Sequence, residues 1–129
     1  MNKLGLDDFN HENAKIEVAD NASGVTVLFS GKINMKNPGE IFNPYLDQLH
    51  QKVVEVGIKD VNADFTNLSF LNSSGLKTLI RWIMQIARLD ATKKYKIKIL
   101  YTNKYSWQET SLTTFSSLVP DLVTEEPVG

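Results

Sequence analysis

The stretch DFTNLSFLNSSGL, residues 64–76, joins a predicted strand to a predicted helix. Apolar and polar residues alternate over residues 61–66, which is the two-residue period of a strand. Beyond Gly75 the period changes to three or four residues, and one wide apolar face collects Leu76, Leu79, Ile80, Ile83, Met84, Ile86 and Ala87. The pattern predicts a strand ending before Asn67, a loop over residues 67–72 and a helix after the loop.

Two more alternating segments lie upstream. Residues 14–19 (AKIEVA) and 24–30 (GVTVLFS) are separated by turn-forming Asn, Ser and Gly residues, so they predict a β-hairpin.

A first helix is expected between this hairpin and the strand at 61–66, because apolar residues recur there at helical spacing. Two starts fit the sequence, Pro38 and Asn43. Pro44 is expected in the first turn, since proline lacks the backbone donor needed deeper in a helix, and Asn43 would then be the N-cap. Gly57 is expected just beyond the C-terminal end.

The remainder of the chain predicts one more strand and one more helix. Lysines alternate with apolar residues over 94–99, which indicates a fourth strand. The sequence SWQE, residues 106–109, is a capping box for a third helix that Pro120 closes. Its expected core contacts are Leu112, Phe115 and either Leu118 or Val119. A short last strand over residues 122–124 is optional.

The order of these elements predicts an α/β fold in one domain over residues 1–129, with 1–13 and 125–129 frayed. We expect a mixed sheet of four to five strands, built from the N-terminal hairpin and two βα units. Right-handed crossovers would place the helices mainly on one face. The alternation in every strand agrees, because strands covered on both faces are almost continuously apolar.

Composition removes several classes of function. The chain has no cysteine, which excludes disulfides, thiolate nucleophiles and cysteine-bound metals. Its two histidines have no partners at ligand spacing, and no glycine-rich phosphate-binding motif is present. We therefore expect no cofactor, no metal and no catalytic activity. No segment is apolar enough to insert into a membrane, and the start of the chain is unlike a signal peptide, so a cytoplasmic protein is predicted.

Charge is segregated although the net charge is only −1. Residues 77–104 carry eight Lys or Arg residues against Asp90 alone. This asymmetry fits either a surface that attracts an acidic partner or an ordinary solvated face. Nucleic acid is not expected as a partner, because the domain as a whole is not basic and has no recognition motif.

Residues 64–76, with the hairpin and the helices around them, resemble the STAS domain family and within it the bacterial anti-sigma-factor antagonists. In that family a strand with an acidic residue leads through an apolar loop to an Asp-Ser-Ser/Thr-Gly-Leu helix start. The resemblance covers roughly residues 14–124, and Asn72 stands where the family has its aspartate.

The resemblance implies a regulatory domain that binds a protein in a partner-switching signalling pathway. The implied partners are a kinase-type anti-sigma factor or related regulator and a PP2C-type phosphatase. The implied phosphorylation site is the serine after the motif aspartate, which is Ser73 here, with Ser74 as second choice. The candidate partner-binding residues are Asn72, Ser73, Ser74, Gly75, Lys77, Arg81 and Trp82.

Other interpretations stay open at the level of sequence. Asn72 and Ser73 are both common N-cap residues and would also fit a purely structural helix start. Trp82 is either an aromatic anchor for a partner or a residue that packs against a neighbouring helix. A ligand-binding or sensory STAS module and a constitutive scaffold that forms a homodimer are the alternative functions.

Overall fold

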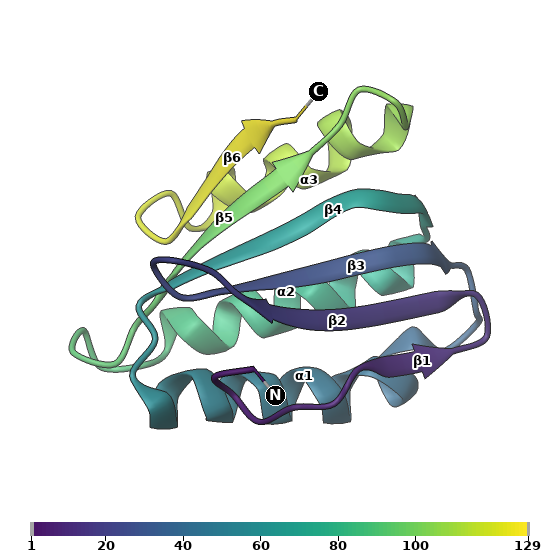
Figure 1. The fold of residues 1–129 in the computed structure, drawn as a ribbon. Helices are drawn as coiled ribbons and strands as arrows, with labels where there is room; N and C mark the ends of the chain where they lie inside the picture. The colour runs from purple at the N-terminus through teal and green to yellow at the C-terminus, as the bar shows by residue number, and fades with distance from the viewer. Residues whose placement is uncertain (1, 129) are drawn as a thin grey trace.

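In the computed structural model, which describes residues 2–128, three helices cover one face of a single mixed sheet (Figure 1). The strands are β1 (Phe9–His11), β2 (Ala14–Asp20), β3 (Val25–Ile33), β4 (Asp60–Leu71), β5 (Lys96–Tyr101) and β6 (Val123–Pro127). The helices are α1 (Pro38–Val56), α2 (Ser73–Ala87) and α3 (Ser106–Leu118).

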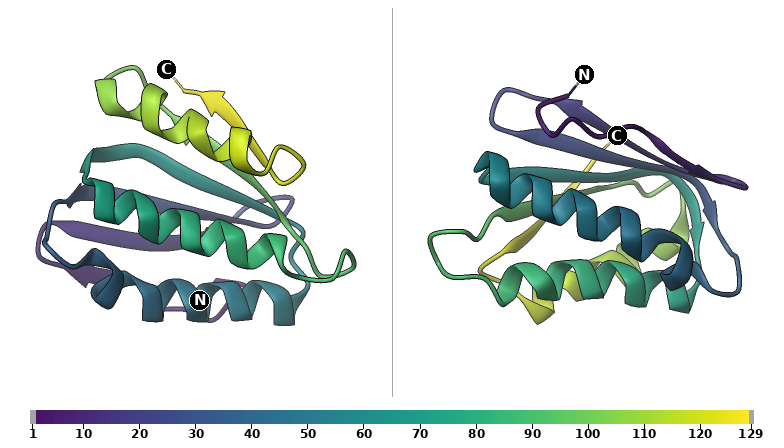
Figure 2. Two further views of the ribbon diagram at one scale, coloured as in Figure 1. Left: turned by 180° about the vertical axis from the view of Figure 1, so that it is seen from behind. Right: turned by 90° about the horizontal axis from the view of Figure 1, so that it is seen from below.

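The strands lie in the sheet in chain order, from β1 to β6. The pairs β1–β2 and β2–β3 are antiparallel, and the pairs β3–β4, β4–β5 and β5–β6 are parallel. All three helices lie on the same side, as the view from behind in Figure 2 shows. The predicted α/β class, mixed sheet and one-sided helices are confirmed, although the sheet has six strands rather than four to five.

The parallel strands bring distant parts of the chain to one end of the molecule. Strands β3 to β6 run in the same direction, so their carboxyl ends and the first turns of α1, α2 and α3 meet at the right-hand end in Figure 1. The start of α2 lies at this end.

Both termini are more ordered than the sequence predicted. The segment 2–13 was expected to fray, but β1 pairs with β2, the side chains of Leu4 and Leu6 are buried, and Tyr45 Oη donates to the Asp7 carbonyl at 2.9 Å. Residues 125–127 continue β6 along β5. The prediction of frayed termini failed because strand pairing at a sheet edge depends on residues distant in the chain. Met1 and Gly129 lie outside the described residues.

Strand β4 is longer than predicted, because residues 67–71 continue it instead of forming a loop. Gly31 adopts φ +87°, and a Cβ there would lie only 1.7 Å from the Asn13 carbonyl oxygen. Register shifts on both sides of Gly31 let β3 follow β4 as far as the pair Ile33 and Leu71. The irregular apolar pattern that suggested a loop is the pattern of a bulged strand pair.

Of the two predicted starts for the first helix, the structure has the one at Pro38. Helix α1 begins at Pro38 with Asn37 as N-cap, so Asn43 is not the cap and Pro44 lies inside the helix at an exposed position. Solvent exposure makes that position tolerable, because the carbonyl that proline leaves unpaired is accessible to water. Gly57 ends α1 with φ 84°, as predicted.

The prediction of a capping box at the start of α3 is wrong. Ser106 is the first helical residue, Tyr105 is the N-cap, and no side-chain cap bond forms there within residues 2–128. Leu112 and Phe115 are buried as expected. Of the two alternatives for the third contact, Leu118 is exposed and Val119 packs, partly buried, against the core.

A buried glutamine in α3 completes β4 where β5 is too short to do so. Strand β5 pairs with β4 only over Asp60–Asp64. Beyond that point Gln108 Nε2 donates to the carbonyls of Phe65 at 2.6 Å and Leu68 at 2.9 Å, and its Oε1 accepts from Thr102 N at 3.0 Å. Gln108 is 0% exposed, and sequence analysis did not single it out.

Replacing Gln108 with leucine should therefore destabilise the fold strongly. The Gln108→Leu variant keeps the volume but leaves three buried backbone groups unpaired, each costing about 1–3 kcal/mol. We expect the free energy of unfolding in urea to fall by about 3 kcal/mol or more. Gln48→Leu on exposed α1 surface is the control and should change it by less than about 0.5 kcal/mol. A loss in Gln108→Leu no larger than in the control would contradict this role.

Three polar side chains in the core between the sheet and the helices are linked by hydrogen bonds. Trp82 Nε1 donates to Tyr95 Oη at 3.0 Å, and Tyr95 Oη lies 2.8 Å from His50 Nδ1. Because the indole can only donate, the tyrosine proton is left to bond a neutral His50 Nδ1. Burial lowers the pKa of His50, and the opposing effect of nearby Asp47 is smaller.

Because His50 is part of this hydrogen-bonded group, the free energy of unfolding depends on pH. The pKa of His50 in the folded state is below its unfolded value of about 6.5, so the unfolded chain binds more protons as the pH falls below that value. The contribution of His50 to the free energy of unfolding is thus full above about pH 6.5 and decreases below it. In His50→Gln this decrease should vanish, so wild type loses more stability than the variant on acidification. An equally steep slope in His50→Gln would contradict the assignment.

Candidate protein-binding site

The candidate site lies where β4 passes directly into α2. Asn72 has extended backbone angles (φ −79°, ψ 172°) and is the N-cap, and Ser73 is the first residue of the helix. The predicted helix start at this position is therefore confirmed. Its place at the carboxyl end of the parallel strands leaves the first turn of α2 at the surface of the molecule (Figure 1).

Asn72 connects three parts of the fold. Its Oδ1 accepts from Gly75 N at 2.7 Å, which is the usual N-cap bond. Its Nδ2 donates to the Met35 carbonyl at 2.9 Å, and its backbone N–H donates to the Ile33 carbonyl at 3.0 Å. An aspartate could accept from Gly75 but could not donate to Met35. The amide therefore fixes the β3–α1 loop to the start of α2 in a way that a carboxylate cannot.

Ser73 and Ser74 are both exposed in the first turn of α2. Neither hydroxyl makes a hydrogen bond to any other part of residues 2–128, so both are available to another molecule. The free N–H groups and the dipole at a helix N-terminus favour an added negative charge.

Gly75 is buried beneath the two serines and has a packing role. A Cβ at this position would lie 2.6 Å from Leu71 Cδ1 and 2.9 Å from Ile33 Cγ2. The absence of a side chain thus lets α2 approach the ends of β3 and β4 closely.

Lys77 and Arg81 are exposed on the next two turns of α2. Arg81 forms a two-pronged ion pair with Asp47 of α1, with Nη–Oδ distances of 2.6 and 3.2 Å. Its guanidinium lowers the pKa of the Asp47 carboxyl. Lys77 has no carboxylate partner within residues 2–128, so its charge is the less compensated of the two.

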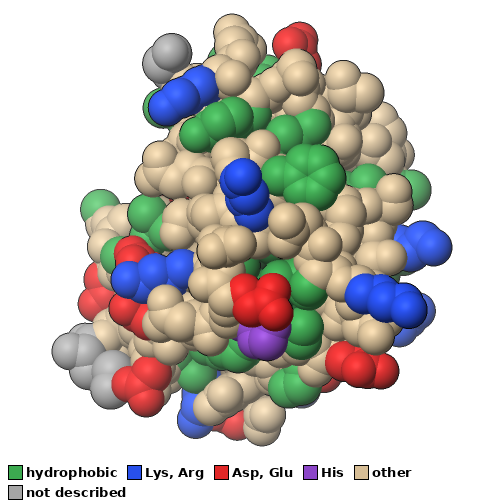
Figure 3. Space-filling model, turned by 90° about the vertical axis from the view of Figure 1, so that its right-hand side faces the viewer, with side chains coloured by type: hydrophobic (Ala, Val, Ile, Leu, Met, Phe, Trp, Pro, Cys, Tyr) green, Lys and Arg blue, Asp and Glu red, His purple; other side chains and the backbone are tan. Residues whose placement is uncertain are grey.

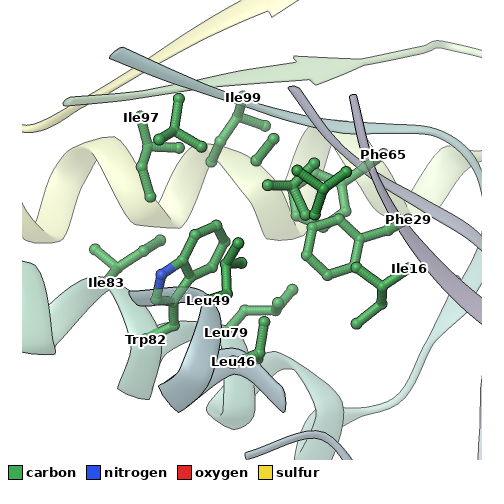
Figure 4. Packing of buried hydrophobic residues seen from close by; sticks show 14 of the residues in the cluster. Ile16, Phe29, Leu46, Leu49, Phe65, Leu79, Trp82, Ile83, Ile97 and Ile99 are labelled. Atoms are coloured by element: carbon green, nitrogen blue, oxygen red, sulfur yellow. The ribbon is translucent and has the colours of Figure 1, made fainter. Parts of the chain in front are cut away.

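Trp82 is not part of this surface, and its assignment as a partner-binding residue is wrong. The side chain is 1% exposed and points from α2 toward the sheet, near Ile97 (Figure 4). Its indole N–H is already used by Tyr95. Of the two sequence interpretations, packing in the core is correct, because the residue lies on the same face of α2 as Leu79 and Ile83.

Two depressions flank the start of α2. The first is a groove between the first turns of α1 and α2, lined by Ser74, Lys36, Lys77 and Arg81, with Glu40 as its acidic residue. The second lies on the other side of Asn72 and is lined by Lys32, Asn34, Ser69, Phe70 and Tyr105; we call it the Phe70 hollow. Figure 3 looks onto this end of the molecule, where hydrophobic side chains reach the surface among Lys and Arg side chains.

Sequence analysis missed the residues of the Phe70 hollow. They come from β3 and the loop after it, the end of β4 and the N-cap of α3, which are far apart in the chain. The available signal was Phe70 itself, a large apolar residue next to Leu71 where strict alternation requires a polar one.

Three features of residues 2–128 bear on other kinds of site. Within residues 2–128 no three His, Asp or Glu side chains are close enough to hold a metal ion. The enclosed cavity between α1, α2 and the sheet has a volume of about 10 Å³, which at most accommodates a water molecule. None of the helices in this range is long and apolar enough to span a membrane.

Of three comparisons with known proteins, the comparison with solved structures supports the fold. No protein-family model matches the sequence, and a search of curated proteins found no match. Among solved structures, the chain is similar to the crystal structure of an anti-sigma factor antagonist from Mycobacterium paratuberculosis. The TM-score is 0.56 with 22% sequence identity, and the match covers 83% of each chain.

The role of the Asn72 amide can be separated from that of its cap. Asn72→Ala should lose both side-chain bonds and reduce the free energy of unfolding by about 1–2 kcal/mol. Asn72→Asp should lose less, because it keeps the bond from Gly75 N and gains about 0.3–1 kcal/mol from the helix dipole. In hydrogen exchange the Gly75 amide should stay protected in Asn72→Asp but not in Asn72→Ala. NMR resonances of Met35 and Lys36 should move in both variants; unmoved resonances in Asn72→Asp would contradict the role of Nδ2.

Proposed function

We propose that this chain, which has the STAS-type fold of the anti-sigma factor antagonists, is a regulatory protein that acts by binding another protein rather than by catalysis. The binding surface is the first half of α2 with its flanking depressions, and its central residues are Asn72, Ser73, Ser74 and Lys77. The partner is a kinase-type anti-sigma factor or a related regulator, the class of partner that the family resemblance implies.

One observation supports this proposal most directly. Ser73 is exposed at the first position of α2, and its hydroxyl has no hydrogen-bond partner within residues 2–128. The residues around it are held firmly, by the Asn72 bonds on one side and by the close packing of Gly75 below. An accessible hydroxyl on a rigid helix start is a suitable target for a partner that docks and modifies it.

Phosphorylation of Ser73 is the switch in this proposal. A phosphate adds about −1.5 to −2 charges and can be tolerated by the helix N-terminus of its own chain. A partner that bound the neutral hydroxyl would meet both the new charge and the new volume, so it would be released. A PP2C-type phosphatase would restore the binding form.

The kinase in this scheme must accept an amide at position 72. The Asn72 side chain is engaged with Gly75 and Met35, so it holds the loop rather than presenting a charge to the partner. We therefore expect the partner to recognise the shape of this surface and its lysines instead of a carboxylate beside the serine.

Substitutions at Ser73 test the switch in a pull-down from lysate of the native source. Ser73→Ala should retain the same partner as wild type, and Ser73→Asp should retain roughly tenfold less, because charge and bulk are placed at the centre of the contact. The control is Ser117→Asp, which adds the same charge to an exposed serine near the end of α3.

The modification is measured directly on the tryptic peptide DVNADFTNLSFLNSSGLK, residues 60–77, by fragment-ion mass spectrometry. Phosphate on Ser73 and equal binding by wild type and Ser73→Ala are the expected results. Equal recovery of one partner by wild type, Ser73→Ala and Ser73→Asp would rule out the switch.

A further inference from the structure

The Phe70 hollow is contiguous with the proposed contact surface but is of a different chemical kind. Phe70 is 45% exposed and is a cross-strand neighbour of Lys32, which it pairs with in the parallel register of β3 and β4. Tyr105, at the N-cap of α3, and Ser69 complete the lining. An aromatic side chain, a partly buried tyrosine and a lysine therefore surround one concavity, only two residues before Asn72.

Hydrogen bonds hold the backbone next to the hollow on both the β4 side and the β3 side. Trp107 Nε1 donates to the Ser69 carbonyl at 3.0 Å, and Gln108 binds the Leu68 carbonyl. On the β3 side the Ile33 carbonyl accepts from Asn72 N. A ligand that binds here orders little of the protein backbone, which lowers the entropic cost of binding.

The charges around the hollow favour an acidic ligand. Lys32 lines it, and Lys104 Nζ lies over the ring of Tyr105, another lining residue, 5.5 Å from the ring centroid. Lys36 and Lys77 stand in the groove on the other side of Asn72. None of these four lysines forms an ion pair within residues 2–128, although Glu40 lines the groove and Glu109 lies in the first turn of α3.

We infer that the Phe70 hollow receives an apolar side chain from an acidic segment of the partner protein, with carboxylates on either side of that side chain bound by Lys32 and Lys104. This inference rests on the proposed function for the existence of a partner and adds the partner's chemistry. It also gives the switch a physical basis, because a phosphate on Ser73 repels a ligand that is itself negatively charged.

A peptide titration tests the hollow without the natural partner. The probes are three acetylated and amidated hexapeptides, EDLFDE, KKLFKK and EDSSDE, added to the full chain labelled for NMR. EDLFDE at millimolar concentration should shift the amides of residues 32–34, 69–71 and 105. KKLFKK, with the opposite charge, and EDSSDE, without an apolar side chain, should shift none of them.

Matched variants separate the two components of recognition. Phe70→Ser and Lys32→Glu should each weaken EDLFDE binding roughly tenfold, through loss of the aromatic contact and of the charge respectively. Val56→Ser is the control, since Val56 is 49% exposed at the C-terminal end of α1, and it should bind like wild type. The inference is overturned if EDLFDE shifts nothing, if KKLFKK shifts the same amides, or if Phe70→Ser binds normally.

Two other occupants would also overturn it. Binding to phosphatidylglycerol vesicles that is lost in Phe70→Ser, without peptide binding, would assign the hollow to a membrane surface. A concentration-dependent dimer in sedimentation that Phe70→Ser dissociates would assign it to a second copy, whose residues 124–128 (TEEPV) are acidic with an apolar end.

Failure of this inference is distinguishable from failure of the proposed function. Peptide binding at the hollow together with equal partner binding by the Ser73 variants would contradict the phosphorylation switch and support the hollow as a binding site. A Ser73 switch that works although the peptide does not bind would support the proposed function and overturn the inference about the hollow.

Discussion

The side chain of Asn72 is the constraint on which the candidate site depends. One amide both accepts from the helix that follows it and donates to the Met35 carbonyl in the β3–α1 loop. The position of Ser73 relative to both flanking depressions is set by these bonds, and the buried Gly75 allows the close helix–sheet contact that they require. A replacement that satisfies only one side, as a carboxylate does, changes the shape of the surface even where the helix survives.

A second constraint shapes the neighbouring hollow. Strand β5 pairs with β4 only as far as Asp64, so the last part of β4 needs hydrogen-bond partners from elsewhere. The side chains of Gln108 and Trp107 supply them from the first turn of α3. The same contacts bring Tyr105 beside Phe70, so the device that completes the sheet also forms an aromatic depression at the surface.

Electrostatics links the two parts of the site. The lysines at this end of the molecule come from β3, α2 and the loops that precede α1 and α3. Arg81 is the basic residue there whose charge is offset, by Asp47. A surface of this kind attracts acidic partners over a distance, and an added phosphate at its centre would reverse that attraction locally. The proposed switch and the proposed partner chemistry are therefore two consequences of one charge distribution.

The sequence by itself determined the α/β class, the one-sided arrangement of helices and the start of α2 at Ser73, because these follow from local periodicity and capping preferences. The tertiary structure alone decided that residues 2–13 and 125–127 are ordered and that β4 runs to Leu71. It also decided that Trp82 is buried and that Phe70 and Tyr105 share a hollow. The physical reason is that edge pairing, bulges, burial and surface concavities depend on contacts between residues distant in the chain, which no local pattern records.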